Sequence, residues 1–126
     1  MTDAKKRFSF RSRVKSFGYA LRGIFDFFSG EHNARVHLFA AVAVIGMGIW
    51  LSISVTQWMV VILLIGVVFM AELFNTAIEK LCDLVISDFN PKIKKIKDLS
   101  AAAVFVAAIT AAIIGLIIFV PSFINK

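Results

Sequence analysis

The chain has 126 residues, of which 60% are hydrophobic and 17% are charged, and its mean hydropathy is +0.87. These charges are too few to cover a water-soluble domain of this size, so the composition argues against a soluble protein and favours a lipid-facing surface. The net charge is +6, but the basic residues flank apolar segments, which favours contact with anionic lipid head groups over nucleic acid. The length allows one domain, 1–126, and the single cysteine, Cys82, excludes an internal disulfide framework.

A basic, aromatic stretch opens the chain over residues 5–30. It interleaves seven lysine and arginine residues with apolar residues that recur at helical spacing, namely Val14, Phe17, Leu21, Ile24 and Phe28. This pattern predicts an amphipathic helix that lies in the membrane interface.

Three long apolar segments follow, and they predict transmembrane helices over 34–55, 57–86 and 98–120. A bilayer core of roughly 30 Å takes about 20 helical residues to cross, and a helix satisfies its own backbone hydrogen bonds there. The uncharged linker Ser52–Gln57 predicts a helical hairpin, whereas the charged linker Ser87–Lys97 predicts a solvated turn. We expect Asp98 to cap the start of the last span and Pro121 to end it. The expected fold class is therefore an all-α membrane protein, with an N-terminal amphipathic interfacial helix followed by three transmembrane helices.

The basic residues also predict an orientation. Residues 1–36 hold eight of the fourteen basic residues and residues 80–97 hold five more, while the Ser52–Gln57 turn has none. The positive-inside rule then places both basic regions in the cytoplasm and the C-terminus outside. All eight acidic residues fall on or near the cytoplasmic side.

Four polar side chains mark the second span. Glu72, Asn75, Glu79 and Asp83 fall within an arc of about 80° when successive residues turn by 100°. A carboxylate at membrane depth costs at least a few kcal/mol unless it has a partner, a proton or water. One interpretation is a carboxylate that only fixes helix packing, but four aligned groups favour a site for a metal, another cation or a proton.

Other polar residues fall near the same level of the membrane. Glu31 precedes the first span, and together with Glu79 it could supply the one or two carboxylates that Mg²⁺ often uses beside phosphates. His32 and His37 are interpreted as interfacial side chains rather than ligands. Lys94, Lys95 and Lys97 are explained mostly by positive-inside anchoring. The sequence has no P-loop, no Gly-rich kinase loop and no His-Arg-Asp motif, which excludes the common soluble phosphotransferase designs.

In combination, these motifs resemble the prokaryotic diacylglycerol kinase family, which includes undecaprenol kinases, over about residues 10–120. The resemblance is carried by Gly18-Tyr19 and Gly23, by Glu31 with Arg35, by Glu72-Leu-Phe-Asn75-Thr76-Ala-Ile-Glu79 with Asp83, and by Lys97-Asp98-Leu-Ser-Ala-Ala-Ala-Val104. One departure is Ser12, where an arginine is expected seven residues before Tyr19, and arginines flank it on both sides. The run from Glu31 to Leu38 and the pair Asn75-Thr76 look closer to the undecaprenol kinases.

The resemblance implies transfer of the γ-phosphoryl group of Mg-ATP to the hydroxyl of a membrane lipid alcohol, either undecaprenol or diacylglycerol. It implies a homotrimer in a bacterial cell membrane, with shared active sites on the cytoplasmic side. Glu72 is the candidate catalytic base, and Glu31 and Glu79 are the candidate metal ligands. The implied nucleotide-binding residues are Tyr19, Glu31, Asn75, Glu79, Asp83, Lys97 and Asp98.

Two other functions compete with a lipid kinase at this point. A small proton-coupled exporter also uses a membrane glutamate, but usually has four spans with the acid in the first. A non-catalytic membrane subunit would have no need of the acidic stripe.

Overall fold

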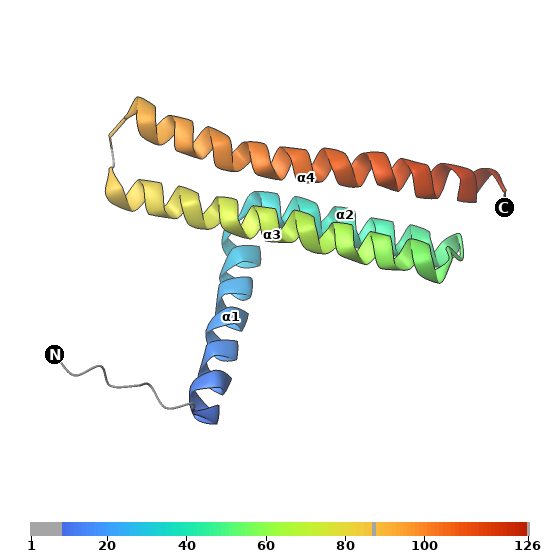
Figure 1. Cartoon of the computed structure of the whole chain (residues 1–126), viewed down its shortest axis with the longest axis horizontal. Coiled ribbons are helices and arrows are strands. Elements are labelled where there is room, and N and C mark those ends of the chain that lie inside the picture. The colour runs from blue at the N-terminus through green and yellow to red at the C-terminus, as the bar shows by residue number, and fades with distance from the viewer. Residues whose placement is uncertain (1–8, 87, 126) are drawn as a thin grey trace. The chain divides into compact units, whose positions relative to one another are not determined.

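A computed structural model describes residues 9–86 and 88–125, which form four helices joined by short connections (Figure 1). The helices are α1 (Phe10–Gly30), α2 (His32–Trp50), α3 (Val55–Val85) and α4 (Pro91–Ile124). Three of them, α2, α3 and α4, are long and apolar enough to cross a membrane. The all-α class with three membrane-spanning helices after an N-terminal helix is thereby confirmed.

Helix α1 belongs to a compact unit that ends at Glu31, and it is separate from the unit that begins at His32. It runs through Gly18 and Gly23 without a break, and its buried residue is Phe27, whose ring contacts that of Phe28 edge-on. Its other large apolar side chains are mostly exposed, as an interfacial helix requires. Lys5, Lys6, Arg7 and Phe8 of the predicted stretch lie outside the described residues.

The α2–α3 hairpin is closed by a tight, apolar contact. Gly48 leaves no room for a side chain, because a Cβ there would lie 2.9 Å from the Trp58 ring. Ser54 caps α3 in a reciprocal arrangement, in which its hydroxyl accepts from the Gln57 amide and the Gln57 side chain accepts from the Ser54 amide. These contacts hold the predicted hairpin in a turn of four residues, Leu51 to Ser54.

The hydrophobic core lies at the same end of the bundle as this turn. Its buried members are Leu51, Ile53, Val61, Ile118 and Phe119, with Trp58 packed against them. Trp50 at the end of α2 also contacts Phe123 near the end of α4. The end of the bundle that holds the hairpin is therefore packed by apolar contacts, and the polar residues gather towards the other end.

The expected turn over Ser87–Lys97 is wrong for most of its length. Helix α4 begins at Pro91, because the Asn90 side chain accepts hydrogen bonds from the Lys92 and Ile93 amides and proline suits the first helical position. Asp98 is consequently no cap but an interior helical residue that pairs with Lys94. Lys94, Lys95 and Lys97 therefore belong to helix α4 rather than to a solvated turn.

The expected end at Pro121 is also wrong, since α4 continues to Ile124. Proline removes only its own amide donor, and the following turn is closed by the Asn125 amide on the Pro121 carbonyl. The Ser122 hydroxyl also donates to the Ile118 carbonyl at 2.7 Å, which supports the helix past the proline.

The two connections offer exposed positions at which the predicted orientation of the chain in the membrane can be tested. Ser52 lies in the α2–α3 turn and Asp88 in the α3–α4 connection, and both are exposed. In a Cys82→Ser background, Ser52→Cys should react with an impermeant thiol reagent on intact cells, whereas Asp88→Cys should react only after permeabilisation. Labelling of position 88 alone on intact cells would reverse the orientation.

Candidate active site

The polar stripe of α3 passes from a buried to an exposed environment. Glu72 and Asn75 are only 3% and 6% exposed, Glu79 is partly buried, and Asp83 is exposed. Along an α-helix, the seven residues from Glu72 to Glu79 correspond to about 10 Å, or two turns. The stripe therefore presents a carboxylate in a dry position and a second one closer to solvent.

A cleft of about 360 Å³ opens beside this stripe. Helix α3 contributes Glu72, Asn75 and Glu79 to its lining, and α2 contributes Asn33, Val36 and His37. Helix α4 contributes Ala101, Val104, Phe105 and Ala108. All four α4 side chains that line the cleft are apolar, and they face the two carboxylates across it. The structure thus brings three of the predicted site residues into one cavity.

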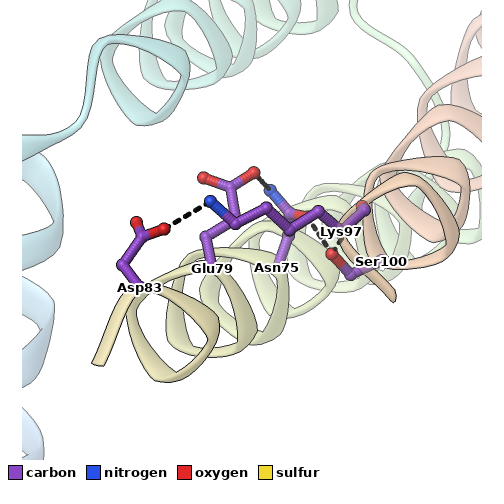
Figure 2. A network of polar contacts seen from close by, with 5 residues as sticks. All are labelled: Asn75, Glu79, Asp83, Lys97 and Ser100. Atoms are coloured by element: carbon purple, nitrogen blue, oxygen red, sulfur yellow. Dashed lines mark hydrogen bonds and ion pairs between the residues drawn. The ribbon is translucent and has the colours of Figure 1, made fainter. Parts of the chain in front are cut away.

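Asn75 is fixed by two hydrogen bonds that also set its orientation (Figure 2). Its amide Nδ2 donates to Glu79 Oε1 at 3.0 Å, and its Oδ1 accepts from the Ser100 hydroxyl at 2.6 Å. Ser100 is itself buried and also lies 2.9 Å from the Lys97 carbonyl. Since the donor side of Asn75 faces Glu79, one oxygen of this carboxylate is held in place and the other is left for a further ligand.

Lys97 reaches across from α4 to the exposed end of the stripe. Its Nζ pairs with Asp83 Oδ1 at 2.5 Å, so the α3 and α4 helices are joined there by an ion pair (Figure 2). An exposed pair of this kind contributes little stability and can exchange partners. A phosphate that arrives beside Glu79 therefore finds a lysine whose present partner is a solvated carboxylate.

Asp98 points to a different side of α4 from Lys97, as adjacent helical residues must. It pairs with Lys94 one turn earlier, and both side chains are largely exposed. Among the described residues, Asp98 does not line the cleft that holds Glu72 and Glu79. Its predicted role in binding the nucleotide gains no support from this contact.

Glu72 has a partner that the sequence interpretation missed. His37 Nε2 on α2 lies 3.2 Å from Glu72 Oε1, and the exposed fractions of the two side chains are 23% and 4%. The buried carboxylate thus has an ion-pair partner on the neighbouring helix, which no spacing between residues 37 and 72 could reveal. Ser100 was also missed, although it falls within the Lys97-Asp98-Leu-Ser motif.

Tyr19 and Glu31 belong to the N-terminal unit. Tyr19 is exposed along α1, and the Glu31 amide closes the end of that helix on the Phe27 carbonyl. Within residues 9–86 and 88–125, no group of three or more histidine, cysteine, aspartate or glutamate side chains is placed to hold a metal. A site that uses one or two carboxylates and completes its shell with phosphates needs no such group. Glu79 fits such a site, because in the described part of the chain only its Oε1 accepts a hydrogen bond.

Comparison with known proteins gives a consistent result. The family described as prokaryotic diacylglycerol kinase matches residues 18–119. An undecaprenol kinase of Bacillus subtilis is 45% identical over 107 residues, which cover 85% of this chain and 87% of that protein. A diacylglycerol kinase of Synechocystis is 37% identical over 84% of this chain and 61% of its own length, and one of Escherichia coli is 27% identical over 79% and 82%.

The match spans α2, α3 and most of α4, and it includes every cleft residue described above. It sets aside a proton-coupled exporter and a non-catalytic subunit, the two functions that competed at the level of sequence. A buried carboxylate, a second carboxylate two turns away and a facing lysine are thus found in a membrane helix bundle whose relatives phosphorylate lipids. The chain belongs to the prokaryotic diacylglycerol kinase family and is a lipid kinase of the membrane.

Proposed function

We propose that this kinase transfers the γ-phosphoryl group of Mg-ATP directly to the hydroxyl of a membrane lipid alcohol. The observation that carries the proposal is the pair Glu72 and Glu79, which line one cleft at different depths. The lipid oxygen forms a bond to phosphorus, the bond from phosphorus to the β–γ bridging oxygen breaks, and ADP leaves. The hydroxyl proton passes to Glu72. Phosphoryl transfer of this kind depends mostly on positioning and on neutralising charge.

Each polar residue then has a distinct part. Glu79, and by the family resemblance Glu31, would hold Mg²⁺, which when bound would supply neutralisation of phosphate charge. Asn75 orients Glu79 through its 3.0 Å hydrogen bond. Lys97 and Asp83 form the pair that a polyphosphate would rearrange, and Tyr19 and Asp98 complete the proposed nucleotide contacts.

An apolar groove of about 630 Å³ supplies a path for the lipid chain. It shares Val36, His37 and Ala108 with the cleft and continues between α2, α3 and α4 towards Phe119. Apart from His37, the residues that line it in the described structure are alanine, valine, leucine, isoleucine, methionine, phenylalanine and glycine. A lipid whose hydroxyl lies at Glu72 can extend its hydrocarbon chain along this groove.

The lining of the groove favours undecaprenol over diacylglycerol. An isoprenoid alcohol carries its hydroxyl directly on a hydrocarbon chain, whereas diacylglycerol has two ester groups near the hydroxyl. Buried ester carbonyls without donors lose hydrogen bonds to water and weaken binding. The similarity to an undecaprenol kinase supports the same choice.

We also propose that the kinase is a homotrimer of the bacterial cell membrane with its active sites on the cytoplasmic side. The polar cleft lies towards the end of the bundle that holds the α3–α4 connection, on the side of Glu72 that leads to the lysines at the start of α4. Positive-inside orientation would give that level access to cytoplasmic ATP.

Replacement of the proposed metal ligand should change the response to Mg²⁺. In Glu79→Gln the amide oxygen can still accept from Asn75, but it is a poorer ligand for a hard cation. Half-maximal activity should then need at least about tenfold more Mg²⁺, measured with detergent-solubilised protein. Asp88→Asn, in the exposed connection, is the charge-matched control. Unchanged activity of Glu79→Gln at limiting Mg²⁺ would remove Glu79 from the metal site.

Replacement of the proposed base should affect turnover rather than binding. Glu72→Gln keeps the shape of the side chain but cannot take a proton, so kcat should fall by about 10²–10⁴-fold with ATP binding almost unchanged. Oligomeric state must be measured on the same preparation, because a loss of assembly would also abolish activity. A two- or threefold drop, or radiolabel from γ-labelled ATP retained on denatured protein, would count against this mechanism.

The two candidate lipids can be compared directly. In mixed micelles at equal mole fraction, undecaprenol should give a kcat/KM at least about tenfold above that of diacylglycerol, since each poorly paired ester would cost on the order of 1 kcal/mol or more. A higher value for diacylglycerol would reverse the assignment and leave the lipid kinase activity itself intact.

A further inference from the structure

His37 is the polar residue that α2 places against the proposed base. Its Nε2 lies 3.2 Å from Glu72 Oε1, which is an ion-pair contact at the long end of hydrogen-bond distances. The remaining members of the α3 stripe have other partners, since Asn75 bonds Glu79 and Ser100, and Asp83 bonds Lys97. The His37–Glu72 contact is therefore separate from the network that orients Glu79.

His37 also lies where the two cavities meet. It lines both the polar cleft and the apolar groove, together with Val36 and Ala108. Of these three shared residues, it alone carries a polar side chain. A lipid that extends its chain along the groove and places its hydroxyl at Glu72 must pass this imidazole.

A buried base needs help that the apolar bundle does not give. An ionised carboxylate at 4% side-chain exposure has lost most of its water, so an N–H donor is needed to stabilise the anion. A donor on Oε1 also fixes the rotation of the carboxylate and leaves Oε2 to accept the hydroxyl proton. This is the general arrangement in which a base is oriented by a third group.

We propose that His37 is a positioning residue that donates its Nε2–H to Glu72 and directs the second carboxylate oxygen to the lipid hydroxyl. The inference rests on the proposed role of Glu72 as the base. It assigns the imidazole a tautomer with the proton on Nε2. His37 does not itself take the proton from the lipid.

Two amide variants and one apolar variant test the donor. Glutamine can place an N–H close to the position of Nε2, asparagine is too short to reach Glu72, and phenylalanine keeps the volume without a donor. His37→Phe and His37→Asn should lower kcat by about 10–100-fold with the KM for ATP within about twofold of the wild type. His37→Gln should recover kcat to within about fivefold of the wild type. A purely structural role would not separate glutamine from asparagine.

His32→Phe is the matched control, because His32 is the other histidine of α2 and is exposed. Its kcat should stay within about twofold of the wild type. Thermal stability and oligomeric state are measured for every variant. If phenylalanine prevents folding, the comparison of glutamine with asparagine decides the question.

A double variant separates this inference from the proposed function beneath it. If the two residues act as a unit, His37→Phe should lower kcat little further in a Glu72→Gln background. Full turnover of Glu72→Gln would remove the base, and with it the reason for the positioning role. An inactive Glu72→Gln beside an almost fully active His37→Phe would overturn the inference about His37 alone. Equal losses for His37→Gln and His37→Asn in folded protein would also overturn it.

Discussion

The constraint on which the site depends is the cost of keeping a carboxylate out of water inside an apolar bundle. Glu72 is 3% exposed and lies on a helix whose neighbours are almost all hydrophobic. Several kcal/mol would be lost if it were both ionised and unpaired. The chain meets this cost with His37 from α2, so the position of α2 on α3 and the chemistry of Glu72 depend on each other. Loss of His37 would leave the Glu72 carboxylate buried without this partner.

The other polar residues of the stripe are subject to the same cost of burial, and this cost falls along α3 from Glu72 to Asp83 as exposure to solvent rises. Asn75 is neutral and can be buried at lower cost, provided that both ends of its amide are bonded, as they are by Ser100 and Glu79. Glu79 is partly solvated, and Asp83 is exposed enough to need no buried partner. The order of residue types along the helix therefore matches the order of local polarity. In the proposed mechanism, one helix thus holds the base at its buried level and the phosphate-binding groups at its exposed level.

Much of this arrangement could be predicted from the sequence, and each failure has a physical cause. The length and apolarity of the three spans predict membrane helices, and the 100° rotation per residue places Glu72, Asn75 and Glu79 on one face, as the shared cleft confirms. A solvated turn is the wrong prediction for the start of α4, and it arises because a run of lysines is typical of solvated loops. Asn90 instead caps a helix that begins at Pro91, so Asp98 lies inside that helix. The role of His37 could not be predicted because it depends on a contact with Glu72, which lies 35 residues further along the chain on another helix. Helical periodicity within one segment gives no information about such a contact.

Burial of Glu72 also bears on which nucleophile the enzyme accepts. Water is the competing acceptor for any enzyme that activates ATP, and exclusion of water is one way to prevent its attack. Apart from His37, the lining of the groove beside Glu72 in the described structure offers no polar side chain to hold water, whereas a lipid chain fits its apolar surface. The groove therefore offers a binding surface for the chain of a lipid alcohol, which would bring its hydroxyl to the carboxylate, but it offers few hydrogen bonds to water. In the proposed mechanism, the burial that makes an ionised Glu72 costly would favour phosphorylation of lipid over hydrolysis of ATP, and His37 lies at the junction of the two cavities.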